Sequence, residues 1–191
     1  LAEKDALVVI AKGLGLHIVL RRLVGRFHRP EELVFLINTT HEEERTLLLG
    51  LAKAGIDPPP AVLNNECTAQ ERVELYLAGG VILVTARIFI VDLLCDRVPV
   101  EQATGLVVAN AHRVSEGSNS AFISRIFRQR NKTAFVKALS DDAHGFTRGF
   151  AKVEKVMRML HCKRLQLWPR FHIRVSAYRA HSRPHQTARG T

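Results

Sequence analysis

The segment ALVVIAKGLGLH, residues 6–17, runs from an apolar stretch into two closely spaced glycines. Its first part, residues 6–11, is apolar at odd and even positions alike, as a strand covered on both faces of a parallel sheet requires. Gly13 and Gly15 then permit a tight turn into a helix, and nucleotide-binding α/β domains place their phosphate loop at this position. The segment therefore predicts the first strand–loop–helix unit of an α/β domain.

Similar apolar runs recur at spacings that leave room for a helix between them. They lie at residues 33–38, 81–84, 104–109 and 134–139, and helical patterns occupy residues 41–54, 68–78, 118–130 and 146–160. Thr40 and Thr68 are placed to cap the first two of these helices, the second as a capping box with Glu71. Strands and helices in this alternation predict a doubly wound, mostly parallel sheet with right-handed crossovers.

The composition sets broad limits on the class of protein. The 191 residues are 47% hydrophobic, which fits one globular domain, and no apolar run of about 18 residues predicts a membrane span. Cys67, Cys95 and Cys162 are odd in number and far apart, so we expect a reducing compartment and neither a disulfide framework nor a zinc site. The chain starts at Leu1 without a leader, so we do not expect secretion, and the absence of Met suggests an incomplete N-terminus.

The net charge of +10 is unevenly distributed along the chain. Residues 155–191 hold nine Lys and Arg and no acidic residue, and a second basic stretch is opposed only by Glu116. This stretch consists of Arg113, Arg125, Arg128, Arg130, Lys132 and Lys137. A polyanion is the predicted partner, although each single residue could equally belong to a solvated helix face. From residue 178 onward the apolar period is lost, which predicts a domain at 1–177 and a basic, disordered tail at 178–191.

The phosphate loop lacks the side chains that phosphates and magnesium need. Such a loop requires a Lys that reaches the β and γ phosphates and a Ser or Thr that binds the metal, but Leu16 and His17 stand in those places. Lys12 precedes Gly13 and Gly15, on the wrong side of the turn to substitute. Taken alone, the two glycines would favour an ordinary strand-to-helix turn.

The strand at residues 104–109 leads into Ala109-Asn110-Ala111-His112. A helicase of the DEAH kind carries Asp-Glu-Ala-His there, and its two carboxylates bind magnesium and position the attacking water. Ala109 and Asn110 replace both carboxylates, so nothing remains to hold the metal or to stabilise the transferring phosphoryl group. We therefore predict that this chain has no ATPase activity, no metal site and no cofactor.

Several further motifs carry a specific resemblance. They are GGVILVTAR at residues 79–87, IVDLLCDRVP at 90–99, IFRQRNK at 126–132 and LWPRFH at 167–172. With the loop at residues 12–15 and the Ala-His-Arg at 111–113, this order resembles the N-terminal helicase-like module of the XPF family of structure-specific DNA repair endonucleases, over residues 5–175. The resemblance implies the RecA-like first lobe of a superfamily 2 helicase.

The resemblance also implies what such a lobe does. It suggests a nuclear domain that has lost ATP turnover and serves nucleotide excision repair and interstrand crosslink repair by binding DNA at single-strand/double-strand junctions. The family's nuclease domain, with a Glu-Arg-Lys metal site that uses a divalent ion such as magnesium, is absent from this chain, so no nuclease activity is expected. The expected protein partners are the smaller heterodimer subunit, reached through the missing C-terminal region, and nuclease-scaffold and damage-recognition proteins. No membrane partner is expected.

Candidate nucleic-acid contacts follow from relatives of this fold, in which the segments after the second strand and after the strand at 81–84 contact the nucleic-acid backbone. Thr39, Thr40, Thr85 and Arg87 occupy these segments, although helix capping is the favoured alternative for Thr40. The full candidate set is Thr39, Thr85, Arg87, Arg113, Arg125, Arg128, Arg130 and Lys132. For His112 we expect a structural hydrogen bond, and for Trp168 core packing or docking. The alternative function is a protein-docking scaffold that recruits the nuclease to other repair factors.

Overall fold

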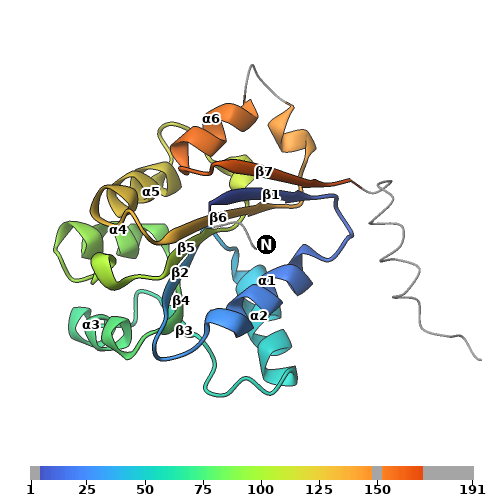
Figure 1. Cartoon of the computed structure of the whole chain (residues 1–191). Helices are drawn as coiled ribbons and strands as arrows, with labels where there is room; N and C mark the ends of the chain where they lie inside the picture. Colours follow the sequence, from blue (N-terminus) through green and yellow to red (C-terminus); the bar gives the residue numbers. More distant parts are fainter. Residues whose placement is uncertain (1–4, 148–151, 170–191) are drawn as a thin grey trace, which may run out of the picture.

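The computed structural model describes residues 5–147 and 152–169, which form one seven-stranded sheet with helices on both faces (Figure 1). The strands are β1 (Ala6–Ile10), β2 (Leu33–Ile37), β3 (Ala61–Leu63), β4 (Gly80–Val84), β5 (Gly105–Val108), β6 (Phe135–Ser140) and β7 (Arg164–Trp168). Every described strand pair is parallel, and the order across the sheet is β3-β4-β2-β5-β6-β1-β7. All seven carboxyl ends therefore lie along one edge of the sheet.

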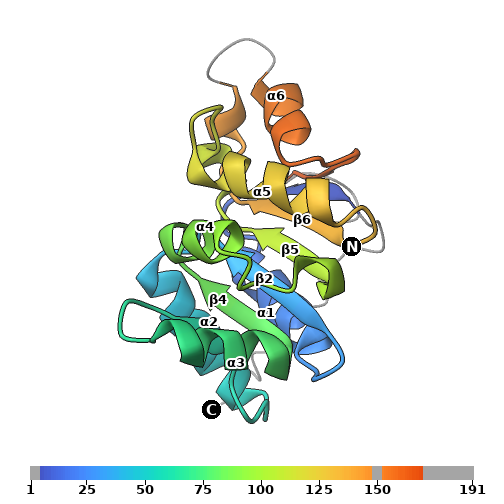
Figure 2. The same ribbon diagram turned by 90° about the vertical axis from the view of Figure 1, so that its left-hand side faces the viewer.

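The helices are divided between the two faces of the sheet. They are α1 (Leu16–Phe27), α2 (His41–Lys53), α3 (Ala69–Ala78), α4 (Ala86–Leu94), α5 (Asn119–Arg130) and α6 (Lys152–Met159), with short 3-10 turns η1 (Val100–Gln102), η2 (Ala111–Arg113) and η3 (His144–Phe146). Helices α1 and α2 pack on one face, while α3, α4, α5 and α6 pack on the other, toward the viewer in Figure 2. The predicted doubly wound α/β architecture is confirmed.

Phe35, at the centre of β2, organises the larger of the two apolar layers. Its fully buried ring lies 4.6 Å from the ring of Phe89 in α4, 5.8 Å from Tyr76 in α3 and 6.5 Å from Phe127 in α5, measured between centroids. The neighbouring Leu36 points to the opposite face, because successive side chains of a strand alternate. A strand that is apolar at every position thus supplies both layers of the core.

Both predicted cap residues set where their helices begin, and Thr40 forms a full capping box where only a cap was predicted. Thr40 accepts a hydrogen bond from the Glu43 backbone N–H while the Glu43 carboxylate accepts one from the Thr40 N–H, and Thr68 and Glu71 are paired in the same way. Helix α3 ends at Gly79, which has a φ of 77°. A side chain there would collide with the carbonyl oxygen of Pro30, so only glycine fits this turn.

Several elements differ from their prediction. The sequence did not predict strands β3 and β7 or helix α4. Strand β3 has only three residues, and β7 is a basic edge strand that pairs with β1. The α4 segment is too uniformly apolar to show a helical period. The helix expected from Phe146 starts at Lys152 in α6, and Phe146 itself ends the turn η3. Trp168, expected in the core or at a docking surface, lies on the edge strand β7 and is 43% exposed.

No helix of the described residues is both long and apolar enough to span a bilayer. The predicted tail at 178–191 and the end of the LWPRFH motif lie outside the described residues. The boundary between domain and tail therefore stays a prediction.

Candidate functional site

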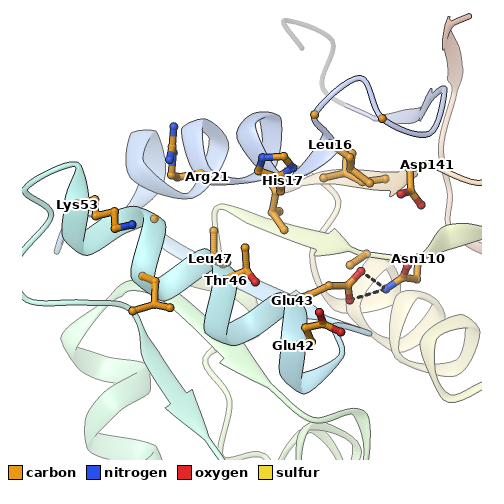
Figure 3. A pocket seen from close by; sticks show the side chains of 17 residues that line it. Leu16, His17, Arg21, Glu42, Glu43, Thr46, Leu47, Lys53, Asn110 and Asp141 are labelled. Atoms are coloured by element: carbon orange, nitrogen blue, oxygen red, sulfur yellow. Dashed lines mark hydrogen bonds between the residues drawn. The ribbon is translucent and has the colours of Figure 1, made fainter. Parts of the chain in front are cut away.

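A hollow of about 570 Å³ opens at the carboxyl edge of the sheet, between α1 and α2 (Figure 3). Its lining brings together the residues of the degenerate nucleotide site, which are far apart in the sequence: Gly13, Gly15, Leu16 and His17 after β1, and Ala109 and Asn110 after β5. Lys12 is not among the described residues that line it. Six of the residues predicted for the degenerate nucleotide site thus line one hollow, and its role in nucleotide binding stays a prediction.

The turn after β1 combines two glycines of positive φ with Leu16 and His17 at the start of α1. Gly13 and Gly15 have φ values of 87° and 85°, in the left-handed region that favours glycine. Gly15 then precedes the first residue of α1, Leu16, whose side chain lies in the hollow beside that of His17 (Figure 3). An apolar side chain and an imidazole cannot supply the cation and hydroxyl that a phosphate–magnesium group requires.

Asn110 and Glu43 form a pair on the other wall of the hollow. The Asn110 side-chain amide donates to the Glu43 carboxylate at 2.8 and 3.1 Å and to the Asn38 carbonyl at 3.1 Å (Figure 3). Asn38 returns a hydrogen bond to the Ala109 carbonyl at 2.7 Å. Because Glu43 also belongs to the capping box of α2, this network ties the ends of β2 and β5 to the start of α2. We did not predict the role of Glu43 from the sequence, since it lies 67 residues from Asn110.

The charge balance of the hollow does not suit a nucleoside triphosphate with magnesium. Its lining holds three carboxylates, from Glu42, Glu43 and Asp141, against the two cations Arg21 and Lys53. Among the described residues, no group of three or more His, Cys, Asp and Glu side chains is arranged to hold a metal ion. The net negative charge of this lining repels a polyphosphate, whereas a working nucleotide site concentrates positive charge.

His112 makes the structural hydrogen bond predicted for it. Its Nδ1 lies 2.8 Å from the Ser140 hydroxyl at the end of β6, and the Asp142 backbone N–H donates to the same hydroxyl at 3.1 Å. Burial lowers the pKa of His112 below its usual value, although the nearby Asp142 carboxylate opposes the shift. The imidazole is therefore neutral at neutral pH and links the segments after β5 and β6.

The candidate contact residues at the carboxyl edge differ in whether their side chains are available to bind a phosphate. The Thr39 hydroxyl donates to Glu44 at 2.7 Å, and the first turn of α2 holds three glutamates, which repel a phosphate. Thr85 precedes α4 as its N-cap residue but makes no side-chain cap hydrogen bond, and the first turn of α4 has no acidic residue. Thr85, Arg87 and Arg113 are exposed. These three remain available to a phosphate backbone, whereas Thr39 is already engaged.

The basic residues at the end of α5 are held in ion pairs. Arg128 donates to Asp5 at 2.8 Å and to the Ala134 carbonyl at 2.9 Å, and the side chains of Arg128 and Asp5 are only 12% and 6% exposed. Arg130 pairs with Asp96 at 2.7 Å and with Glu101 at 2.9 Å. We therefore leave Arg128 and Arg130 out of the candidate interface, because their donors bind the protein itself.

The basic stretch at 113–137 does not form one surface. Helix α5 starts near the carboxyl edge and spans about 18 Å at 1.5 Å per residue, so Lys132 lies toward the opposite end of the sheet from Arg113. Lys137 is buried within β6. Arg125 stays exposed near the middle of α5, over the ring of Phe122. The clustering of basic residues along the sequence therefore predicted a larger interface than the structure allows. The reason is that a helix places its successive residues at different positions on the surface.

The all-parallel seven-stranded sheet with helices on both faces is a RecA-like α/β fold. Its fold matches the Pyrococcus furiosus Hef helicase domain with a TM-score of 0.74 and 22% sequence identity, over 92% of this chain and 38% of that chain. Comparison with protein-family models finds no match.

The relatives in sequence are DNA repair proteins. The chain is 42% identical to the DNA repair endonuclease XPF of Cricetulus griseus over 184 residues, which is 96% of this chain and 20% of that protein. It is 33% identical to the DNA repair protein rad16 of Schizosaccharomyces pombe over 92% of this chain and 20% of that protein. The chain is thus similar in sequence to the N-terminal region of XPF-type DNA repair endonucleases, and it spans about a fifth of the length of these relatives.

Proposed function

We propose that this chain is a DNA-binding platform that does not hydrolyse ATP and holds the backbone of a single-strand/double-strand junction for a DNA repair nuclease. In this role it serves nucleotide excision repair and interstrand crosslink repair in the nucleus. It acts without metal or cofactor of its own. Its protein partners are the smaller nuclease subunit, nuclease scaffolds and damage-recognition factors.

One observation carries the proposal. The Asn110–Glu43 hydrogen bonds occupy the wall where a helicase keeps its metal-binding and water-positioning carboxylates, while the end of β4 keeps Thr85 and Arg87 exposed beside a helix start without acidic residues. In this proposal the hollow between α1 and α2 has a structural role, and the exposed groups after β4 bind phosphate. The sequence relationship to DNA repair endonucleases supports the same substrate class.

The test is binding of a fluorescent splayed-arm DNA junction at low and at physiological salt. Because each phosphate contact contributes about 1 to the slope of log affinity against log salt, replacing Arg87 and Arg113 together by Ala should lower that slope by about 2. Arg22→Ala is the matched control, since Arg22 is exposed on α1, on the other face of the sheet. Unchanged junction affinity in the double variant would contradict the proposed contacts.

Nucleotide binding is measured on the same protein. We expect no binding of ATP with magnesium, because the hollow lacks a phosphate-binding Lys and carries net negative charge. Saturable, magnesium-dependent binding of ATP would contradict the proposal that the lobe is inactive toward ATP.

A second function, docking of other proteins, is favoured by exposed apolar side chains. Leu77 on α3, Leu94 on α4 and Leu167 on β7 are 69%, 63% and 61% exposed. Partner binding through such side chains depends little on salt, whereas DNA affinity falls steeply as salt rises. The salt dependence of each complex therefore separates the two functions.

A further inference from the structure

A second groove of about 620 Å³ lies on the face covered by α3 to α6, along the first half of α5 and against the end of α6. Helices α5 and α6 are neighbours in Figure 2. The groove brings together Phe122 and Arg125 from α5 with Arg158, Met159 and His161 from the end of α6 and the residues that follow it. The α5 residues of the groove are more than 30 positions before those at the end of α6. Neither the nucleotide hollow nor the candidate contacts at the carboxyl edge include Phe122, Arg158, Met159 or His161.

The groove combines cations with an aromatic ring. The Arg125 guanidinium lies 5.3 Å from the centroid of the Phe122 ring, and both Arg125 and Arg158 are exposed. Within residues 5–147 and 152–169, no hydrogen bond or ion pair engages the Arg158 side chain. Two exposed guanidinium groups, one of them over the Phe122 ring, lie with a Met side chain along the groove and offer a phosphate partner and an apolar surface for a base.

Two other lining groups set the charge of the groove at neutral pH. Burial lowers the pKa of His161, and the nearby cations Arg128 and Lys132 lower it further, so this imidazole is neutral and adds hydrogen-bonding capacity without charge. Among the described residues that line the groove, one is acidic, Glu116. Two arginines against one glutamate leave the groove net positive.

We propose that this groove binds an unpaired nucleotide of single-stranded nucleic acid, with its base against Phe122 and Met159 and its phosphates at Arg125 and Arg158. The inference rests on the proposed function, because the groove is then the binding site for the single-stranded arm of the junction. An acidic protein segment would use the two arginines alone. The aromatic ring under Arg125 favours a nucleotide, since every base has a face that stacks.

The experiment compares single-stranded oligothymidylate with a blunt hairpin duplex, using fluorescence anisotropy and the whole 191-residue chain. Phe122→Leu keeps an apolar side chain but removes the ring, and should weaken oligothymidylate binding about fivefold or more. Arg125→Ala with Arg158→Ala should lower the salt slope for oligothymidylate by about 1.4, at about 0.7 per single-strand contact. Duplex affinity should change little in either variant, and Arg22→Ala should change neither.

Crosslinking gives a readout that electrostatics alone does not produce. A 4-thiothymine in the oligonucleotide should crosslink to the peptides that contain Phe122 or Met159, and Phe122→Leu should reduce the yield. Circular dichroism and thermal unfolding check that each variant stays folded. Competition by polyglutamate that is insensitive to Phe122→Leu would overturn the nucleotide site in favour of an acidic segment.

The outcomes separate this site from the carboxyl-edge contacts. If the junction binds and Arg87→Ala weakens it, but the groove variants behave like Arg22→Ala, the groove proposal is overturned and the proposed function stands. If the arginine pair weakens binding but Phe122→Leu does not, base recognition is overturned. If the folded chain binds no DNA even at low salt, both proposals fail.

Discussion

Asn110 shows how one side chain changes the role of a site. Its amide nitrogen can donate to Glu43, which a carboxylate at the same position cannot do at neutral pH. The residue also has a φ of 50°, in the left-handed region that Asn and Asp tolerate better than other side chains. An amide at this position therefore permits a hydrogen-bond network that joins β2, β5 and α2.

Restoring the acidic residue tests this network. We expect Asn110→Asp to destabilise the fold by about 1–3 kcal/mol at neutral pH, because it sets a carboxylate at a buried position against the half-buried Glu43 carboxylate where a hydrogen bond was. The loss should shrink at about pH 5, since one shared proton relieves the repulsion. Denaturant unfolding at both pH values measures this, and ATP binding should stay absent because Leu16 and His17 remain.

A second substitution provides the matched control. Combined with Asn110→Asp, Glu43→Gln reverses donor and acceptor, and Gln still suits the capping box. We expect the double variant to recover most of the lost stability, which a double-mutant cycle quantifies. Additive losses would contradict the role given to the Asn110–Glu43 pair.

Arg128 is a structural residue in this protein. Arg128→Ala leaves the buried Asp5 carboxylate with the Val136 backbone N–H and the exposed Lys163 as its remaining partners, so the free energy of unfolding should fall by about 2 kcal/mol, measured by denaturant unfolding. The exposed Arg22→Ala should change it by no more than about 0.5 kcal/mol. A stable Arg128→Ala variant with weakened DNA binding would return Arg128 to the interface.

At the scale of the elements, Asp92 joins α3 to α4. Its carboxylate has no exposed surface and accepts hydrogen bonds from Arg72 at 2.7 and 2.9 Å, from the Tyr76 hydroxyl at 2.8 Å and from Arg97 at 3.2 Å. Burial alone raises the pKa of Asp92, but the hydrogen bonds, above all those from Arg72, outweigh it and hold the pKa below its ordinary value. This cluster supports α4, whose first residues include Arg87.

The cluster makes stability depend on pH in one direction. A depressed carboxyl pKa contributes stability above the unfolded-state pKa of about 4, and that stability is lost as pH falls through the folded-state value. Asp92→Asn should cost about 3 kcal/mol at neutral pH and should remove part of this acid-induced loss. Unfolding curves from neutral to acidic pH test this, with the exposed Asp96→Asn as the control. An acid profile unchanged in Asp92→Asn would contradict the assignment.

Helix α5 carries different roles along its length. Its first half contributes Phe122 and Arg125 to the groove, and its last turn contributes Arg128 and Arg130 to ion pairs with Asp5, Asp96 and Glu101. A helix places residues three and four apart on one face and moves its ends apart by 1.5 Å per residue. The basic stretch of the sequence is therefore divided between binding and stability.

At the scale of the whole molecule, the fold should not need its last residues. Residues 178–191 carry no acidic group and no apolar period, so a chain that ends at residue 177 should unfold with the same free energy to within about 0.5 kcal/mol. Thermal and denaturant unfolding measure this, and junction binding at two salt concentrations shows how much the tail contributes to affinity. A large loss of stability would show that the domain extends beyond residue 177.

The sequence by itself determined the fold class, and it is the source of the prediction that ATP chemistry is lost. Five apolar runs, the Thr40 cap and the Thr68–Glu71 capping box are local patterns, and Leu16, His17, Ala109 and Asn110 stand at fixed offsets within motifs, so each could be read without knowing what lies beside it. The same local rules failed for β3, β7 and α4, whose short or uniformly apolar segments lack a period of their own.

Only the tertiary structure decided which of the predicted residues can act. Glu43 hydrogen-bonds to Asn110, Arg128 pairs with Asp5, and Phe122 and Arg125 line one groove with Arg158, although these residues are 33 to 123 positions apart in the sequence. The physical reason is that hydrogen bonds and ion pairs depend on distances of about 3 Å, which the sheet order and the helix crossings set. Charge and spacing along the chain do not contain those distances.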